Sequence, residues 1–140
     1  MKQFTEIACV SIAVPSIDDA LPAYTTGLGL EVTGERRESK RGFGMEWIEL
    51  GAEGRTFLEL IAPTGEGGPV AKFLDQEGTS HVYQVRFAVD DLDEALKELG
   101  QRGLSVIKGQ DVPGDPRVGW VHPKSTGGVL IELVQFDVAN

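Results

Sequence analysis

Two glutamates stand alone among apolar residues in two short segments of similar sequence. Glu59 lies within LELI at residues 58–61, and Glu132 lies within IELV at residues 131–134. A carboxylate inside an apolar strand is costly to bury unless it is paired or used. When two carboxylates lie close together, their repulsion raises the pKa of one, which then keeps its proton. The pair then provides a base and an acid, which can move a proton between two faces of a carbon atom. The two segments therefore predict a polar site suited to acid–base chemistry.

The two segments belong to an internal repeat that runs through the chain. Residues 12–14 (IAV) match residues 87–89 (FAV), and at the same spacing residues 17–21 (IDDAL) match residues 92–96 (LDEAL). Each half predicts a strand, a helix and three further strands, which is a βαβββ unit. In the first half, strands are predicted near residues 7–14, 29–36, 44–50 and 55–62, and a helix is predicted to begin after an N-cap at Ser16. In the second half, strands are predicted near 82–89, 104–108, 117–122 and 128–135, and a helix is predicted over 91–102. A connecting helix is predicted between the halves, over 68–75.

Alternation along the opening strand of each half decides which side chains accompany the glutamates, because successive side chains of a strand point to opposite faces. The helix-packing face is expected to carry Ala8, Val10, Ile12 and Val14 in the first half and Tyr83, Val85, Phe87 and Val89 in the second. The other face carries Cys9, Ser11 and Ala13, and then Gln84, Arg86 and Ala88. Cys9 and Gln84 therefore occupy repeat-equivalent places on the face of Glu59 and Glu132.

Length and composition limit the classes of function. The 140 residues predict a single domain over 1–140, with one repeat unit at about 5–65, a connecting helix at about 68–77 and the other unit at about 80–137. The net charge of −9 argues against nucleic acid as a partner. A single cysteine favours the reducing cytoplasm. The N-terminal residues, with Glu6 and Pro15, predict neither a signal peptide nor a membrane span.

The repeat and several motifs resemble the vicinal oxygen chelate superfamily, which includes glyoxalases, bleomycin-resistance proteins and extradiol dioxygenases. Within it, the chain is most similar to the methylmalonyl-CoA epimerase family over nearly its whole length. The segments that carry the resemblance are HPKSTGGVLIELVQ at 122–135, SIAVPSIDDALPAY, GPVAKFL and RFAVDDLDEAL. The resemblance implies an α+β fold in which two tandem βαβββ units form an open, cup-shaped mixed β-sheet around one divalent metal.

The metal ligands of the superfamily come from the first and last strands of each unit, usually as histidines and as Glu or Gln. By resemblance these places fall on Cys9, Glu59, Gln84 and Glu132, so both histidines are replaced. If a metal binds, these four residues are its expected ligands, and it would be weakly held; no organic cofactor is expected. Arg86 is the residue expected to take the place of the metal, because a guanidinium can neutralise glutamates or hold a carboxylate.

The leading interpretation is an epimerase-like isomerase that moves a proton next to a carbonyl through an enolate. Glu59 and Glu132 would be base and acid in either order, and Arg86, Gln84 or a residual metal would stabilise the oxyanion. The substrate would be methylmalonyl-CoA or another small carboxylate or thioester. The residues expected to bind the substrate are Cys9, Ser11, Trp47, Gln84 and Lys124. The family also suggests a homodimer.

Other interpretations remain open at the level of sequence. Arg86 could form structural salt bridges in a site without activity, in a ligand-binding protein of the bleomycin-resistance type. A metal-dependent lyase of the glyoxalase kind is a further alternative. Cys9 could serve as a small apolar residue rather than a ligand. The basic run at 34–44 could meet the phosphates of a coenzyme A thioester or could be an ordinary solvated loop.

Overall fold

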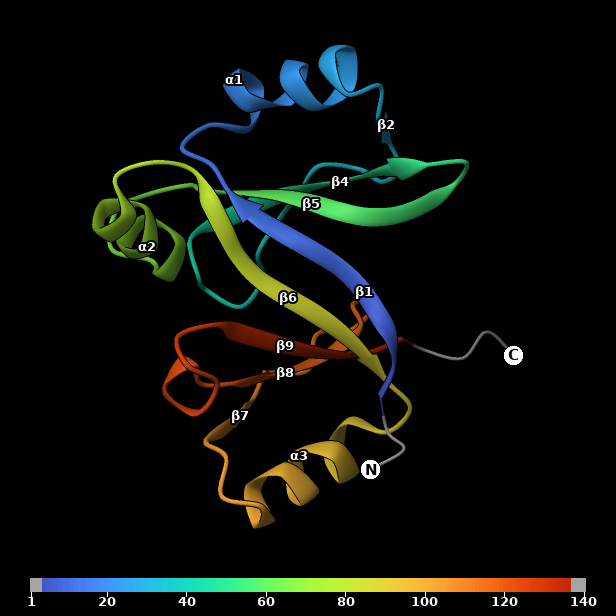
Figure 1. The fold of residues 1–140 in the computed structure, drawn as a ribbon, viewed down its shortest axis with the longest axis vertical. Helices are drawn as coiled ribbons and strands as arrows, with labels where there is room; N and C mark the ends of the chain where they lie inside the picture. Colours follow the sequence, from blue (N-terminus) through green and yellow to red (C-terminus); the bar gives the residue numbers. More distant parts are fainter. Residues whose placement is uncertain (1–3, 137–140) are drawn as a thin grey trace. The chain divides into compact units, whose positions relative to one another are not determined.

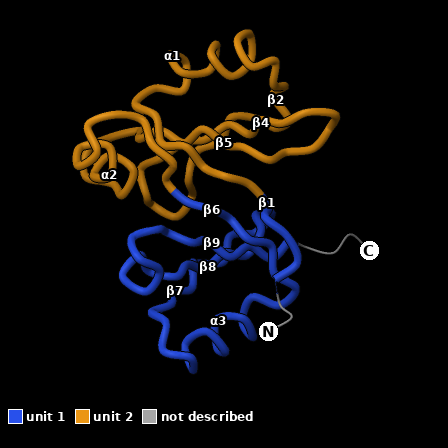
Figure 2. Tube along the Cα trace, viewed as in Figure 1, with its two compact units in different colours: residues 1–8, 84–140 blue, residues 9–83 orange. Residues whose placement is uncertain are grey.

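The computed structural model describes residues 4–136 and divides the chain into two compact units (Figure 2). Taken in the order of their repeats, the first unit is residues 9–83, orange in Figure 2, and the second unit is residues 1–8 together with 84–140, blue in Figure 2. The ends of the predicted domain, at 1–3 and 137–140, lie outside the described residues. The first unit thus holds most of the first repeat and the connecting helix, and the second unit holds most of the second repeat.

The first unit is a sheet with the strand order β2-β4-β5-β1, in which β3 pairs with β4. Its elements are β1 (Phe4–Ala13, of which residues 4–8 belong to the second unit), α1 (Ile17–Pro22), a π-helical turn (Ala23–Gly27), β2 (Glu31–Val32), β3 (Arg37–Glu38), β4 (Met45–Ala52), β5 (Arg55–Pro63) and α2 (Pro69–Glu77). β1 and β5 are parallel, and β4 and β5 form an antiparallel hairpin. Ser16 begins α1 as predicted, because its hydroxyl accepts a hydrogen bond from the Asp19 amide at 3.2 Å.

Each face of this first sheet is covered by a different helix. α1 lies over one face (Figure 1), where Ile17 packs with Val14, Leu50 and Leu60 in an apolar cluster. α2 packs on a cluster that contains Ala13 and Ile61, which belong to the other face. Pro69 at the first turn and the left-handed Gly78 after the last turn set the limits of α2. The face that carries Ala13 and Ile61 is also the face of Glu59, since side chains alternate along β5.

The second unit repeats this design with the strand order β6-β9-β8-β7. Its elements are β6 (His81–Val89, of which the first three residues belong to the first unit), α3 (Leu92–Gln101), β7 (Val106–Lys108), β8 (Arg117–Val121), a 3-10 turn (Pro123–Ser125) and β9 (Leu130–Gln135). Leu92, Leu96 and Leu99 of α3 pack with Leu133 of β9 to form the core. Gly119 permits this close approach, because a Cβ there would lie 3.0 Å from the Leu96 side chain.

The predicted α+β class, with βαβββ units and an open mixed sheet, is confirmed, and three local predictions are corrected. The single strand expected at 29–36 is replaced by the two-residue strands β2 and β3, since Gly34 separates the two. β7 begins at Val106 rather than at 104. Ile12 and Phe87 pack on the helix side as predicted, but Tyr83 stacks edge-to-face on Phe73 of α2, with ring centroids 5.1 Å apart. A long twisted strand meets different neighbours at its two ends, which explains why Tyr83, near the start of β6, packs on α2.

Between residues 4 and 136, the helices are all too short or too polar to cross a membrane.

Asp93, in the first turn of α3, joins the helix to two strands of its sheet. Its carboxylate accepts hydrogen bonds from Lys108 at 3.0 Å and from Arg117 at 2.9 Å. The hydrogen bond from Lys108 and, to a smaller extent, that from Arg117 lower the pKa of Asp93. A lowered pKa contributes stability above the ordinary pKa of an aspartate, and this contribution is lost as the pH falls through the lowered pKa.

We therefore expect Asp93→Asn to lower the melting temperature at pH 7 and to lower it less as the pH falls below about 4, the ordinary range of aspartate. Thermal unfolding followed by circular dichroism between pH 7 and pH 2.5 measures this difference. Asp90→Asn removes an exposed carboxylate from the turn before the helix and serves as the control. A difference that stays constant over the whole pH range would contradict the expectation.

Candidate functional site

Four polar or charged side chains are buried among the described residues, and in each unit they lie on the face that the repeat nominates. They are Ser11, Glu59, Gln84 and Glu132, with exposed fractions of 0%, 5%, 4% and 7%. Each buried polar side-chain atom within residues 4–136 has a hydrogen-bond partner. Buried polar groups are hydrogen-bonded as a rule, and these four are notable because they occupy repeat-related strands of an otherwise apolar core.

In the first unit, Glu59 lies in the middle of a row that crosses three strands. Ser11 of β1 and Glu49 of β4 are its register partners on either side. The Ser11 hydroxyl donates to Oε1 of Glu59 at 2.6 Å. Glu49 is half-buried, and Thr56 donates to its Oε2 at 3.4 Å. Glu59 is thus held by a neutral hydroxyl, with a second carboxylate on the neighbouring strand.

In the second unit, Glu132 lies in the middle of the equivalent row. Arg86 of β6 and Trp120 of β8 are its register partners. Nε of Arg86 donates to Oε1 of Glu132 at 2.9 Å, and Nε1 of the Trp120 indole donates to Oε2 at 3.2 Å. The side chains of Arg86 and Glu132 are only 14% and 10% exposed. Both carboxylate oxygens of Glu132 are therefore held by N–H donors, one of them cationic.

The two rows are repeat-equivalent in position but differ in charge. Ser11 and Arg86 stand at the same place in the opening strand of their units, and each donates to the glutamate of the last strand. A guanidinium neutralises Glu132, whereas a hydroxyl adds no charge beside Glu59. The duplication thus supplies a cationic donor to one glutamate and a neutral hydroxyl donor to the other from the equivalent position.

The other predicted site residues take different positions. Cys9 is buried, and Gln84 lies opposite Leu130, two residues before Arg86 on β6. Trp47 shares the face of Glu59 but packs against the apolar cluster beside α2. Lys124 is exposed in the 3-10 turn, where its amide donates to Nδ1 of His122 at 3.1 Å. Their roles toward a substrate stay predictions.

Two members of these rows were missed by sequence reasoning. Neither Trp120 nor Glu49 is among the site residues that the sequence analysis nominates. The alternation of Ile48 and Leu50 with Trp47 and Glu49 could have placed Glu49 on the face of Glu59, since both apolar residues pack beneath α1. The indole hydrogen bond of Trp120 depends on the register of β8 against β9, which the sequence does not specify.

The donor set that the family resemblance nominates does not fit a divalent metal. Both oxygens of Glu132 already accept N–H hydrogen bonds, and Oε1 of Glu59 accepts a short one from Ser11. Where the resemblance expects imidazoles, which bind such ions well, this sequence has the amide of Gln84 and the buried thiol of Cys9. Over residues 4–136, no group of three or more His, Cys, Asp and Glu side chains is placed to hold a metal ion.

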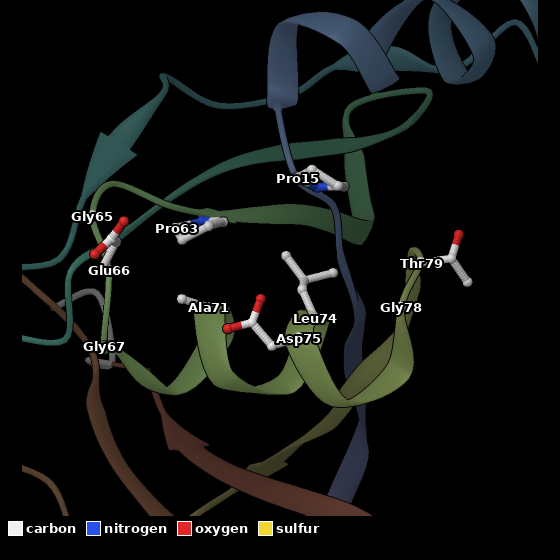
Figure 3. A pocket seen from close by; sticks show the side chains of 10 residues that line it. All are labelled: Pro15, Pro63, Gly65, Glu66, Gly67, Ala71, Leu74, Asp75, Gly78 and Thr79. Carbon is white, nitrogen blue, oxygen red and sulfur yellow. The ribbon is translucent and has the colours of Figure 1, made fainter.

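A separate pocket of the first unit lies between α2 and the ends of β1 and β5 (Figure 3). It is open and has a volume of about 510 Å³. Two carboxylates, Glu66 and Asp75, line it together with Pro15, Pro63 and Leu74. The pocket contains no residue of the two rows, so it is distinct from the predicted site.

Comparison with known proteins agrees with this fold. Residues 10–120 match the model of the Glyoxalase/Bleomycin resistance protein/Dioxygenase superfamily. The chain belongs to this superfamily. It is 32% identical over 133 residues to the ethylmalonyl-CoA/methylmalonyl-CoA epimerase of Cereibacter sphaeroides, and the match covers 90% of this chain and 94% of that protein.

Solved structures give the same result. A methylmalonyl-CoA epimerase from Mycobacterium tuberculosis superposes with a TM-score of 0.85 at 29% identity, covering 97% of this chain and 91% of that one. A variant of the Streptomyces coelicolor methylmalonyl-CoA epimerase, in complex with 2-nitronate-propionyl-CoA, has a TM-score of 0.84 at 26% identity, covering 96% and 99%. The predicted superfamily, and the similarity to the epimerases within it, are confirmed.

The contrast between the two rows predicts unequal coupling energies. Removal of one partner of a buried ion pair leaves the other charge without compensation, so we expect Arg86→Met to lower the free energy of unfolding by about 3 kcal/mol. The double variant Arg86→Met/Glu132→Gln removes both charges, so we expect it to recover most of this loss. The matched cycle with Ser11→Ala and Glu59→Gln removes one hydroxyl hydrogen bond, and we expect a coupling of about 1 kcal/mol.

Urea unfolding of the single and double variants of both cycles measures these energies. Equal coupling in the two rows, or a smaller coupling between Arg86 and Glu132 than between Ser11 and Glu59, would contradict the assignment of Arg86–Glu132 as a buried ion pair.

Proposed function

We propose that this chain is an isomerase of the epimerase class that acts on the coenzyme A thioester of a small carboxylic acid, of the methylmalonyl-CoA kind. The observation that carries the proposal is the burial of Ser11, Glu59, Gln84 and Glu132 on the face nominated by the repeat. The similarity to methylmalonyl-CoA epimerases over nine-tenths of the chain supports the class of reaction, and the Streptomyces coelicolor complex supports a thioester as ligand.

In the proposed reaction, Glu59 accepts the proton from the carbon next to the thioester carbonyl. The electrons of the C–H bond pass to the carbonyl oxygen, which gives an enolate, and protonation of the opposite face restores the thioester with inverted configuration. Glu59 suits the role of base because it is a buried carboxylate whose Oε1 is positioned by the Ser11 hydroxyl at 2.6 Å. Both oxygens of Glu132 already accept hydrogen bonds. Glu132 is therefore better suited to holding Arg86 in position than to transferring a proton.

The enolate oxygen needs positive charge or hydrogen-bond donors that are in place before the reaction. We assign this role to Arg86, whose guanidinium is fixed by Glu132 at 2.9 Å. The indole of Trp120 holds the other carboxylate oxygen and so restrains the pair. The proposed reaction therefore runs without a metal, and Gln84, two residues before Arg86 on β6, is a further donor for the substrate.

The same proposal includes the cytoplasm as the location and a homodimer as the assembly. The single cysteine supports a reducing compartment. Several large apolar side chains of the first unit are exposed, among them Leu28, Val32 and Phe57. A second copy would remove such side chains from water.

Exchange of the substrate's α-proton with deuterium tests the proposed function. We expect the wild-type chain to incorporate deuterium from D2O into methylmalonyl-CoA, as measured by mass spectrometry, and to do so after dialysis against a chelator. Glu59→Gln should slow exchange by about 100-fold or more, the usual contribution of a general base. Glu31→Gln removes an exposed carboxylate of the same unit and should leave the rate unchanged.

Exchange no faster than in buffer, in a protein that is folded and binds the thioester, would contradict the epimerase assignment and favour a binding protein of the bleomycin-resistance type. Loss of exchange after chelation, restored by a divalent ion, would overturn the metal-free reaction but retain the epimerase class.

A further inference from the structure

The polar row of the first unit continues beyond Glu59 to the edge of the sheet. Glu49 of β4 is the register partner of Glu59, and the amide of Thr33, directly after the edge strand β2, donates to the carbonyl of Glu49 at 2.9 Å. Ser11 is 0% exposed and Glu59 is 5% exposed. Glu49 and Thr33 are half-buried. Access to water therefore increases along the row from β1 toward β2.

Two hydroxyls connect the carboxylate of Glu49 to that edge. Oγ1 of Thr56 donates to Oε2 of Glu49 at 3.4 Å, and Oγ1 of Thr33 lies 2.6 Å from Oγ1 of Thr56, with either threonine able to donate. Gly34 leaves room for the carboxylate, since a Cβ there would lie 3.4 Å from Oε2 of Glu49. A hydroxyl both donates and accepts, so the same chain can also run outward from Glu49 with each hydrogen bond reversed.

In the proposed reaction Glu59 takes a proton from the substrate, and it has to lose this proton before it acts as base again. On one side its Oε1 accepts from Ser11, which is itself fully buried and gives no direct access to water. On the other side Glu49 stands directly opposite, where the Cβ atoms of paired residues are about 5 Å apart. Carboxyl groups at this spacing can exchange a proton directly or through one water.

The charges of the pair favour such an exchange. Two like charges directly opposite each other in a sheet repel, and a proton that arrives on Glu59 leaves the pair with a single charge. Transfer to Glu49 breaks the O–H bond of one carboxyl group and forms that of the other, so the net charge of the pair does not change. Glu49 then releases the proton to water along Thr56 and Thr33 and becomes a carboxylate again.

We propose that Glu49 carries protons between Glu59 and water, with Thr56 and Thr33 as the hydroxyl chain at its outer end. This inference rests on the proposed function for the role of Glu59 as base. Glu49 acts through Glu59 rather than by contact with the substrate, so it positions and resets the base.

The fate of the abstracted proton tests the proposal. Each epimer of methylmalonyl-CoA is used in turn as the starting material in D2O, the reaction is stopped at low conversion, and the two epimers are separated and analysed by mass spectrometry. A proton that stays on Glu59 returns to the face from which it came and restores the starting epimer without deuterium. The ratio of deuterium in the remaining starting epimer to product formed therefore measures exchange of Glu59 with water.

We expect Glu49→Gln to lower this ratio roughly tenfold or more, because it removes the group that accepts the proton. The fall is expected for one epimer alone, since the α-protons of the two epimers point to opposite faces of the carbon and Glu59 removes only one of them. Thr56→Val should lower the ratio in the same direction, and it is a second test should Glu49→Gln not fold. The control is Glu31→Gln, an exposed carboxylate two residues before Thr33, which should leave the ratio unchanged.

A purely structural role of Glu49 would lower the rate of epimerisation and leave the ratio unchanged in Glu49→Gln and Thr56→Val, which would overturn the relay and retain the proposed function. An equal fall for both epimers, a fall in Glu31→Gln, or wild-type product formed without deuterium in the remaining starting epimers would also overturn it. A folded wild-type chain that neither epimerises nor exchanges would remove the proposed function and the relay together.

Discussion

A carboxylate buried in a sheet needs a partner that replaces water, and this constraint shapes the candidate site. Glu132 satisfies it with a guanidinium and an indole, and Glu59 satisfies it with a hydroxyl. The strands on either side of each glutamate must keep their register for these hydrogen bonds to form. The apolar clusters beneath α1 and α3 hold that register, because a slip by one residue would turn each glutamate to the helix side.

The repeat provides two copies of the same row, and the two copies have diverged in charge. A hydroxyl at Ser11 and a guanidinium at Arg86 occupy equivalent places, so one glutamate accepts from a neutral donor and the other from a cationic one. In the proposed reaction this difference separates the roles of base and oxyanion support, and the proton transfer depends on charges that are fixed in advance.

Much of the fold and part of the site could be predicted from the sequence. The repeat gave the order of elements, and alternation from Ile12 and Phe87 identified the face on which Ser11, Glu59, Gln84 and Glu132 are buried. The hydrogen bonds of that face could not be predicted, because the partners of Glu132 come from β6 and β8, and their registers are set by long-range packing. Trp120 was missed for the same reason, whereas alternation along β4 could have identified Glu49. β2 and β3 were merged because two-residue strands leave almost no periodic signal.

The metal content of the protein, purified without chelator, tests most directly whether Arg86 stands in place of a metal. Elemental analysis by mass spectrometry should find no transition metal or other divalent ion in stoichiometric amount, either before or after incubation with Co²⁺, Ni²⁺, Mn²⁺ or Zn²⁺ and dialysis. A stoichiometric ion that survives dialysis in the wild-type chain and is lost in Glu132→Gln would contradict the ion pair as the centre of the site.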